Sequence, residues 1–483
     1  MRRTLHTNTT TSPDHCTCKN GGLSGNCQAI HSEACSYHGS TRLRPLHPVS
    51  GASEKIVRYH NVTFILSIHF YDDIKERVIL PPEPIKTYVF DDGFNFNTDN
   101  DIGMLRIFLE TLYKARPRYE AFISSLSTRG NPESGTAPLP PVDAVFCDVS
   151  MSTPIEACHK RGIPVYGFIP ISATLFAHQS SVNKDTPALS DDVFYSGGEA
   201  TNRCDMIAES LKTWQLEFGP AHALATGLLI NSFEELEPQA MAMLKAFPQF
   251  EKVPMTFVGP LLPLENLKSE DILSQRLQHW MDKQEDRSVV YFSFGTAAVP
   301  SAEQLKEIAE ALVSLKRPFI WSLRSPQQTL LSEPFIRTTA ETMTDTTPYL
   351  ILPWAPQKQI LAHKATGVYV SHCGWNSTLE AVSYGVPVVA WPMFGDQHYN
   401  ATLIEQCGMG KCMAVAGMKS STTPASQIAE IIEEVGGCNH EGKPKKPYLG
   451  KAQELAASAR KACGPDGKST SNLEKVLQEV AEF

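Results

Sequence analysis

The chain has 483 residues, of which 42% are hydrophobic and 20% are charged, with a formal net charge of −9. This balance is typical of a globular protein, and the length predicts two domains of about 200–250 residues each. The net charge is acidic and the sequence has no basic stripe, which argues against a nucleic-acid partner. The sequence has no run of about 18 apolar residues, so we expect no membrane-spanning helix.

Residues 1–36 are rich in Thr, Ser, Asn, Gly and Cys and show no periodicity. Such a segment cannot bury enough apolar surface to fold, so we expect a disordered tail. The chain starts without an apolar stretch of the secretory type. We therefore expect a cytoplasmic protein.

From about residue 46 the pattern alternates between helices and strands. The strands expected in the first half are continuous apolar runs at 62–69, 144–148, 163–169 and 226–232. The expected helices have apolar positions at three- and four-residue steps and lie at 50–60, 101–126, 152–162 and about 234–246. Runs of strand length that are apolar throughout indicate strands buried on both faces, as in parallel sheets.

A second series begins after a Pro-rich stretch at 247–287, which indicates a linker with a short helix. Its strands are expected at 288–295, 318–324, 349–355, 367–372 and 386–392. Its helices are expected at 302–315, between the later strands, and at about 446–463 and 469–482. Alternating strands and helices predict an α/β fold of two doubly wound parallel-sheet domains that face a cleft.

The predicted domain organisation has five parts. They are the tail 1–36, an N-terminal acceptor-binding Rossmann-like domain 37–250 with a degenerate first strand, a linker 251–287, a C-terminal Rossmann-like domain 288–463, and a C-terminal helix at 464–483. We expect this last helix to pack back on the N-terminal domain. Ligands of such sheets bind at the carboxyl ends of the strands, which directs attention to Asp148, to residues 293–296 and to residues 372–377.

The densest group of candidate site residues lies between Trp354 and Gln397. Trp354 ends a predicted strand, where an indole can stack on a base or fill a core. Gly374 permits a close backbone approach at the start of the next helix, whose N–H groups and dipole suit a pyrophosphate, and His372 just before it can donate to a phosphate oxygen.

Three further residues of this stretch suit sugar hydroxyls. Glu380, one helical turn further on, can accept hydrogen bonds from a ribose diol, although it also suits a solvated helix position. Asp396 and Gln397 offer an acceptor and an amide, although Asp396 also suits a helix N-cap. Each residue alone has a structural explanation, and their combination at this spacing points to a sugar-nucleotide site.

The stretch 354–397 contains WAPQ, IL, H, G, SHCGWNS, E, GVP, P and DQ in this order. It resembles the characteristic box of family 1 UDP-dependent glycosyltransferases, the enzymes that glucosylate small molecules in plants and fungi. Weaker similarity covers residues 37–483, including FSFGT (292–296) and INSFEELE (230–237). The resemblance implies the two-domain architecture called GT-B, with UDP-glucose as the donor substrate and with no cofactor or metal.

The same resemblance assigns roles to residues of the box. Trp354 would stack on uracil and the Ala355 backbone would pair with it, while Gln357 and Glu380 would hold the ribose. The residues expected at the phosphates are Thr296, His372, Asn376 and Ser377. The residues expected at the sugar are Trp375, Asp396 and Gln397, and the terminal glutamine favours glucose.

The general base of this family is a histidine in the loop after the first strand, which an aspartate orients. Asp148 matches that aspartate, although it also suits a helix cap. RLRPL (42–46) resembles the segment around the base but places Arg42 there, or Ser40 in a looser register. An arginine stays protonated and cannot act as a base, which leaves His38 as the first candidate and His47 as the second.

Three interpretations follow from this departure. In the first, the chain is an active glucosyltransferase that uses His38 or a water as the base. In the second, it is a UDP-sugar-binding protein without activity. In the third, it is an enzyme whose first segment, as given, is a faulty translation of the gene. A nucleotide-binding dehydrogenase is the alternative from another class, but it needs a G-x-G-x-x-G that the sequence lacks.

The expected reaction is the transfer of a hexose with inversion to a hydroxyl of a small apolar acceptor, such as a phenol or terpenoid, by a monomer. The residues expected to line the acceptor site are Phe94, Phe96, Phe168, Ile171, Phe176 and His178.

Overall fold

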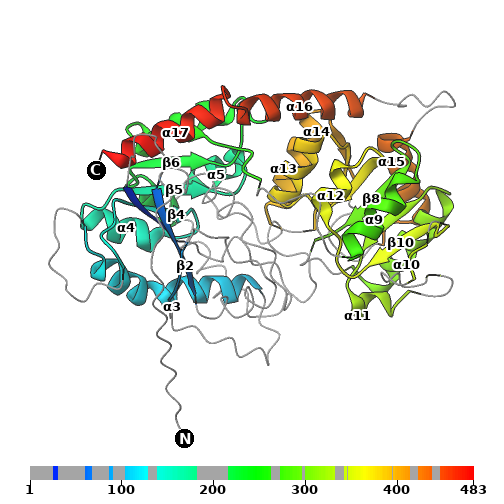
Figure 1. The fold of residues 1–483 in the computed structure, drawn as a ribbon, viewed down its shortest axis with the longest axis horizontal. Coiled ribbons are helices and arrows are strands. Elements are labelled where there is room, and N and C mark those ends of the chain that lie inside the picture. Colours follow the sequence, from blue (N-terminus) through cyan, green and yellow to red (C-terminus); the bar gives the residue numbers. More distant parts are fainter. Residues whose placement is uncertain are drawn as a thin grey trace, which may run out of the picture.

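The computed structural model describes residues 25–30, 60–67, 86–90, 104–128, 139–181, 216–262, 272–295, 300–331, 335, 342–344, 346–393, 395–413, 422–437 and 447–482. Their strands form two parallel β-sheets, one in each half of the molecule (Figure 1). The prediction of a two-domain α/β architecture with parallel sheets is thereby confirmed.

The N-terminal sheet has seven strands in the order β3-β2-β1-β4-β5-β6-β7. Their bounds are β1 Gly25–Ile30, β2 His60–Ser67, β3 Lys86–Phe90, β4 Ala144–Asp148, β5 Val165–Ile169, β6 Gly227–Ile230 and β7 Met255–Phe257. Its helices are α3 Met104–Ser125, α4 Ser152–Lys160, α5 Ala173–Ser180 and α8 Ala240–Lys245. Strands β4, β5 and β6 are buried along their whole length, as their continuous apolar runs require.

The C-terminal sheet has six strands in the order β10-β9-β8-β11-β12-β13. Their bounds are β8 Val289–Ser293, β9 Phe319–Ser322, β10 Tyr349–Leu352, β11 Thr366–Ser371, β12 Val388–Ala390 and β13 Gly410–Cys412. The helices of this half are α9 Ile272–Asp282, α10 Ala302–Ser314, α11 Ser325–Gln328, α12 Gln357–Ala362, α13 Trp375–Tyr384, α14 Gln397–Gln406, α15 Ala425–Gly436 and α16 Tyr448–Cys463. Alternate residues of β8 enter different cores, with Tyr291 on one face of the sheet and Phe292 on the other.

Strands β1 and β7 lie in segments for which a tail and a linker were predicted. Strand β1 lies inside the segment 1–36 that we expected to be disordered, and it is a central strand that pairs in parallel with β2 and β4. Its sequence, GNCQAI, is too polar to predict a buried strand, so pairing with two neighbours overrides composition here. Strand β7 lies inside the expected linker 251–287 and completes the edge of the N-terminal sheet.

The expected helix at 50–60 falls on undescribed residues except for its last position. His60 begins strand β2 instead of ending a helix. The polar residues of 53–60 fit an amphipathic pattern, but His60 is 4% exposed and continues directly into the apolar strand.

The last helix, α17 (Lys468–Ala481), runs from the C-terminal half onto the N-terminal sheet (Figure 1). Ser469 Oγ donates to the Gly259 carbonyl (2.7 Å), and Asn472 Nδ2 donates to the Phe257 carbonyl (2.9 Å). His60 Nε2 lies 2.9 Å from the Leu477 carbonyl. These contacts with the end of β7 and the start of β2 tie the two halves together.

His222 is fully buried in the N-terminal core, where Nδ1 donates to the Phe218 carbonyl at 2.5 Å. Burial lowers its pKa from 6.5 to about 4, against the opposing effect of the backbone hydrogen bonds. The unfolded chain therefore takes up a proton below pH 6.5 that the folded chain takes up only near pH 4. Stability should fall as the pH falls through this window.

We expect the free energy of unfolding to drop by about 1–1.5 kcal/mol between about pH 7.5 and about pH 5.5 from this residue alone. Urea unfolding of the unaltered chain and of His222→Asn, which keeps a donor but does not titrate, measures this contribution as a difference. An equal drop in both proteins would show that His222 is not responsible.

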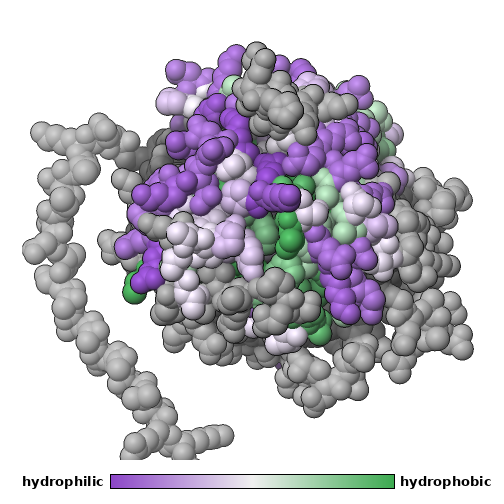
Figure 2. Space-filling model, turned by 90° about the vertical axis from the view of Figure 1, so that its right-hand side faces the viewer, coloured by the Kyte–Doolittle hydropathy of each residue, from purple (hydrophilic) through white to green (hydrophobic). Residues whose placement is uncertain are grey.

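No helix among the described residues is both long and apolar enough to cross a membrane. The end of the molecule formed by the C-terminal half shows mainly hydrophilic residues around a smaller hydrophobic area (Figure 2).

Candidate functional site

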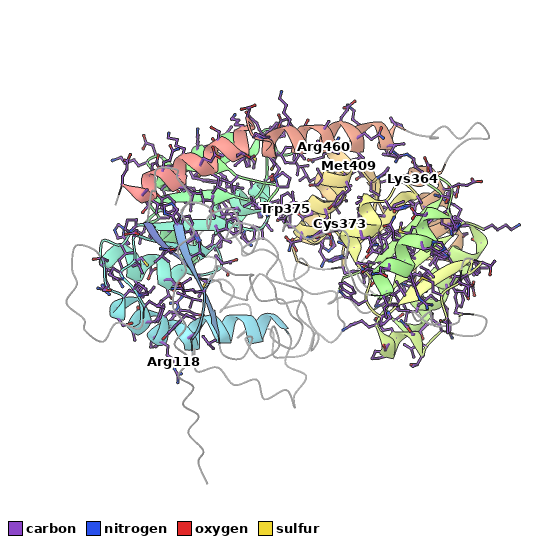
Figure 3. The ribbon with its side chains drawn as sticks, in the orientation of Figure 1. Arg118, Lys364, Cys373, Trp375, Met409 and Arg460 are labelled. Carbon is purple, nitrogen blue, oxygen red and sulfur yellow. The ribbon has the colours of Figure 1, made fainter. Side chains whose placement is uncertain are left out.

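The segments that follow β10, β11 and β12 carry most of the predicted site residues. Figure 3 shows Trp375 and Cys373, which follow β11, on the side of the C-terminal half that is nearer the N-terminal half. Parallel strands end at the same edge of a sheet, so the three segments meet there.

Trp354 follows β10 and is 61% exposed. The interpretation of this tryptophan as a core residue is therefore wrong. The next residue, Ala355, is buried, and α12 begins at Gln357 with Pro356 as its N-cap. An exposed indole beside a buried backbone segment is a surface on which a flat ring can stack.

His372 is held in a narrow space between two glycines. A Cβ atom built on Gly295 would lie 2.8 Å from His372 Cε1, and one built on Gly374 would lie 2.8 Å from His372 Nε2. Gly295 also has a φ of +71°, which side-chain-bearing residues rarely adopt. The loops after β8 and β11 therefore fix the imidazole, which is 4% exposed.

Helix α13 begins at Trp375, three residues after this histidine. Gly374 is its N-cap and provides no side-chain acceptor for the N–H groups of the first turn, which includes Asn376 and Ser377. Cys373 connects strand to helix with a φ of +63°, an uncommon conformation for a residue other than glycine. A helix start of this kind suits an anion such as a phosphate group.

Burial raises the pKa of the Cys373 thiol well above its usual value. Its sulfur lies 3.6 Å from the Ser371 carbonyl, and its backbone N–H donates to Ser371 Oγ at 3.0 Å. Cys373 is therefore a buried, unreactive thiol that shapes the turn.

The side chains of Gln357, the first residue of α12, and Glu380, in α13, meet in the protein interior. Gln357 Nε2 donates to Glu380 Oε2 at 2.5 Å and to Ser377 Oγ at 3.1 Å. Gln357 Oε1 accepts from the hydroxyls of Tyr369 (2.9 Å) and Tyr291 (3.3 Å). Glu380 is 3% exposed, and the bond from Gln357 gives this buried carboxylate one of the hydrogen bonds that it needs.

Asp396 does not act as an ordinary helix cap. It occupies the N-cap position of α14 without a side-chain cap hydrogen bond. Its Oδ2 instead accepts from the Trp375 backbone N–H (3.3 Å) and from Asn400 Nδ2 (2.8 Å). Gln397, which is fully buried, accepts from the Met393 backbone N–H at 2.8 Å. Both side chains are thus held at the start of α13 and α14.

Asn400 is a site residue that sequence reasoning missed. Its amide donates to Asp396 Oδ2 and to the Cys373 carbonyl (2.9 Å), so it joins α14 to the turn before α13. The signal was the i, i+4 spacing of Asp396 and Asn400 on one helix, which allows a carboxylate–amide hydrogen bond.

Trp375 joins the two halves of the molecule. Its Nε1 donates to the Asn231 carbonyl, which follows β6, at 2.9 Å. His178 of α5 lies against Tyr399 of α14 with ring centroids 5.4 Å apart. The N-terminal half therefore contacts the elements that carry Trp375 and Gln397.

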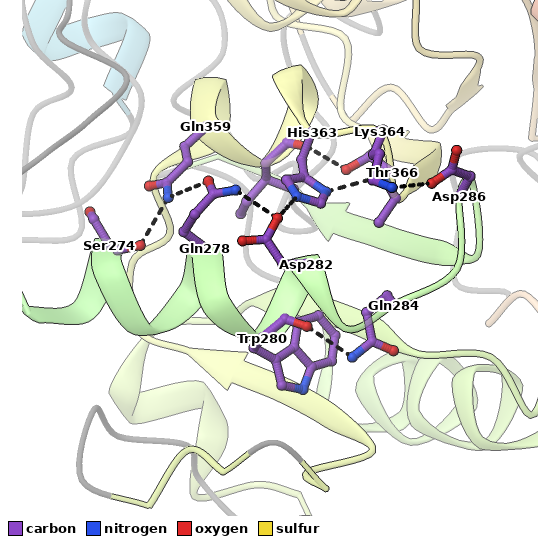
Figure 4. Close-up of polar contacts among 12 residues, drawn as sticks. Ser274, Gln278, Trp280, Asp282, Gln284, Asp286, Gln359, His363, Lys364 and Thr366 are labelled. Carbon is purple, nitrogen blue, oxygen red and sulfur yellow. Dashed lines mark hydrogen bonds and ion pairs between the residues drawn. The ribbon is translucent and has the colours of Figure 1, made fainter.

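Helix α12 is anchored to α9 by polar contacts outside the site (Figure 4). Gln359 Nε2 donates to the Ser274 carbonyl at 2.9 Å. His363 Nδ1 accepts from the Ala365 backbone N–H, so Nε2 carries the proton and donates to Asp282 Oδ1 at 3.0 Å. This hydrogen bond lowers the pKa of Asp282.

Asp148 ends β4 and is 1% exposed. Its Oδ1 accepts from Ser150, from the backbone N–H at 2.9 Å and from the hydroxyl at 2.6 Å. The N-cap of the next helix is Met151, so Asp148 is not the side-chain cap of α4. The structure places this carboxylate at the carboxyl edge of the N-terminal sheet.

Several predicted residues lie outside the described residues, namely His38, Ser40, Arg42, His47, Phe94, Phe96 and Thr296. Of the described acceptor candidates, Phe176 is fully buried and packs on Phe218 and Phe250, so it is a core residue and not a lining residue. The described residues contain no group of three or more His, Cys, Asp and Glu side chains suited to a metal ion.

Residues 161–435 match the family model described as UDP-glucoronosyl and UDP-glucosyl transferase. An anthocyanidin 3-O-galactosyltransferase of Rhododendron delavayi is 30% identical over 71% of this chain and 75% of its own length. A UDP-glycosyltransferase of Arabidopsis thaliana is 30% identical over 74% of this chain and 80% of its own length.

Solved structures share the fold. A UDP-glucosyltransferase from Polygonum tinctorium that glucosylates indoxyl superposes with a TM-score of 0.73 over 96% of this chain and all of that chain, at 24% identity. A Phytolacca americana protein complexed with UDP-2-fluoro-glucose and pterostilbene gives a TM-score of 0.71 over 95% of this chain and all of that chain, at 21% identity.

Proposed function

The chain belongs to the UDP-glucoronosyl and UDP-glucosyl transferase family, and we propose that it transfers glucose from UDP-glucose to a hydroxyl of a small apolar acceptor with inversion at the anomeric carbon. Members of this family transfer a sugar from a UDP-sugar donor. The choice of glucose, the stereochemistry and the class of acceptor are the parts that we add.

The observation that carries the proposal is the convergence of four features at the carboxyl edge of the C-terminal sheet. They are the exposed indole of Trp354, the imidazole of His372 that two glycines confine, the start of α13, and the buried carboxylate of Glu380. A base, a pyrophosphate and a ribose present complementary groups: a flat ring, negative charge and a diol.

At the donor, Trp354 stacks on uracil, which pairs with the backbone of Ala355. The phosphates lie against the start of α13, with hydrogen bonds from His372, Asn376 and Ser377, while Gly374 leaves room for them, and Thr296 adds a hydroxyl. The Asp396 carboxylate accepts hydrogen bonds from the sugar hydroxyls, and the Gln397 amide donates to them. The backbone of Trp375, tied to Asp396, lies beside the sugar.

At the acceptor, a base takes the hydroxyl proton as the oxygen attacks the anomeric carbon from the face opposite the departing UDP. This displacement inverts the anomeric carbon, and Asp148 orients the base and stabilises its protonated form. His38 is the base that the sequence offers. The structure adds His31 to the candidates His38 and His47, because His31 directly follows Ile30 of β1 in the sequence and Ile30 pairs with Cys147, the neighbour of Asp148.

Incubation with UDP-glucose and two acceptors, an acidic phenol and an aliphatic alcohol, tests this function. We expect a β-glucoside, and we expect the phenol to react faster if Arg42 has displaced the base, because an ionised phenol needs less proton removal. The variants His38→Ala and His31→Ala should then identify the base, because loss of the base slows the reaction with the alcohol. Tight UDP binding without any product would favour a UDP-sugar-binding protein that lacks activity.

Gln397 is expected to favour glucose over galactose, because its amide is fixed by Met393 and can distinguish the orientation of a sugar hydroxyl. The expected outcome is a higher kcat/KM for UDP-glucose than for UDP-galactose, and a shift towards galactose in Gln397→His. Equal values for both donors in the unaltered chain would contradict this preference.

A further inference from the structure

Residues 231–237, which follow β6 of the N-terminal sheet, pack into the core of the C-terminal half. Phe233 and Leu236 are at most 1% exposed, and they belong to a hydrophobic cluster that includes buried residues of α13 and α14. The Asn231 carbonyl accepts from Trp375 Nε1, at the start of α13, at 2.9 Å. This bridge segment (231–237) thus comes from the N-terminal half but is fixed to the two helices on which we place the donor sugar.

The last residue of the bridge segment, Glu237, holds the start of α5 and is 2% exposed. Its Oε2 accepts from the Ala173 backbone N–H at 3.0 Å, and its Oε1 accepts from the backbone N–H and the hydroxyl of Thr174 at 2.9 and 2.8 Å. The N–H groups of the first turn of a helix have no partner within it, and a carboxylate there also interacts favourably with the helix dipole. Three hydrogen bonds to one buried carboxylate therefore fix α5 to the bridge segment.

Helix α5 also contacts the C-terminal half directly. It follows β5 at the carboxyl edge of the N-terminal sheet and lies on the side of that half nearer α13 (Figure 1). The ring of His178, in α5, lies against Tyr399, two residues after Gln397 in α14, with centroids 5.4 Å apart. The position of α5 relative to α13 and α14 is therefore set at two separate points, the bridge segment and this ring contact.

We propose that Glu237 and the indole of Trp375 are positioning residues for glucosyl transfer, which set the distance between an acceptor at the carboxyl edge of the N-terminal sheet and the sugar at α13 and α14. The inference rests on the proposed function, because it needs a donor sugar and an acceptor that meet between the two halves. UDP lies against the C-terminal half, so its affinity does not depend on the bridge segment. The transfer rate does, because a displacement of about 1 Å can slow a reaction by about 10²-fold.

The test compares kcat for glucosyl transfer to an acidic phenol with the dissociation constant of UDP, measured by calorimetry. Glu237→Gln keeps the size of the side chain but turns an NH₂ group towards N–H donors that need an acceptor. We expect kcat to fall by about 10- to 100-fold and UDP affinity to stay within about twofold. Trp375→Phe, which removes the indole donor, should lower kcat by about 3- to 10-fold in the same pattern. Both changes act through one segment, so the double variant should lose less than the product of the two single losses.

Glu235→Gln is the matched control, because Glu235 lies in the same segment but is exposed, and it should keep both kcat and UDP affinity. The stoichiometry of UDP binding counts the folded molecules, so a general loss of stability would leave kcat per binding site unchanged.

An unchanged kcat per site in Glu237→Gln would overturn the positioning role, as would a loss of UDP affinity equal to the loss of kcat. If that variant does not fold, an unchanged kcat in Trp375→Phe has the same meaning. An unaltered chain that binds UDP but transfers glucose to neither the phenol nor an aliphatic alcohol would instead overturn the proposed function, and the inference with it.

Discussion

Replacing Asp148 by asparagine is expected to lower kcat for an alcohol acceptor by about 10²–10⁴-fold while UDP affinity stays the same. The asparagine keeps the shape and the contacts to Ser150, but it removes the charge that stabilises a protonated base. The kcat for an acidic phenol should fall by a smaller factor, because an ionised phenol needs less help with proton removal. Kinetics with both acceptors and calorimetry with UDP measure these effects.

Asp143→Asn is the control for this substitution, because Asp143 is also buried and lies near the opposite end of the same strand. It should leave kcat within about threefold of the unaltered value, because Asp143 lies at the end of the strand away from the proposed base. If Asp148→Asn is as active as Asp143→Asn, the carboxylate at the end of β4 has no part in proton transfer.

Gly295→Ala is expected to weaken UDP binding by about 10- to 100-fold, which corresponds to the loss of a hydrogen bond to a charged phosphate. The new methyl group would lie 2.8 Å from His372 Cε1 and displace the imidazole. It would also place alanine at a φ of +71°, at a cost of about 1–2 kcal/mol in folding stability. Calorimetry with UDP separates the two effects.

Gly162→Ala provides the matched comparison. Gly162 has a φ of +67°, and a Cβ built there has no atom within 4 Å. It should therefore carry the conformational cost without any change in UDP affinity. Equal UDP affinities in the two variants would mean that the position of His372 does not matter for binding.

The parts of the fold that sequence predicted best are strands buried on both faces. Strands β4, β8 and β11 are continuous apolar runs between helices, so composition alone locates them within two residues. Strand β1 could not be found in this way. Its residues GNCQAI are mostly polar or small, and its place in the sheet depends on pairing with β2 and β4, which are distant in sequence.

The candidate site shows a similar division. Its box was recognisable because many residue types occur at fixed spacing between Trp354 and Gln397. The hydrogen-bond partners of those residues could not be recognised from the sequence. The Asp396 contact to the start of α13 and the tyrosine pair at Gln357 depend on which strands are neighbours, and a single sequence does not give that register.

Calorimetric titration of UDP into the unaltered chain and into Glu380→Ala tests the central claim, that the carboxyl edge of the C-terminal sheet is a UDP-sugar site. We expect saturable binding by the unaltered chain and an affinity at least about tenfold weaker in the variant, because the variant loses hydrogen bonds to a carboxylate. No heat of binding with millimolar UDP, or equal affinity in both proteins, would contradict it.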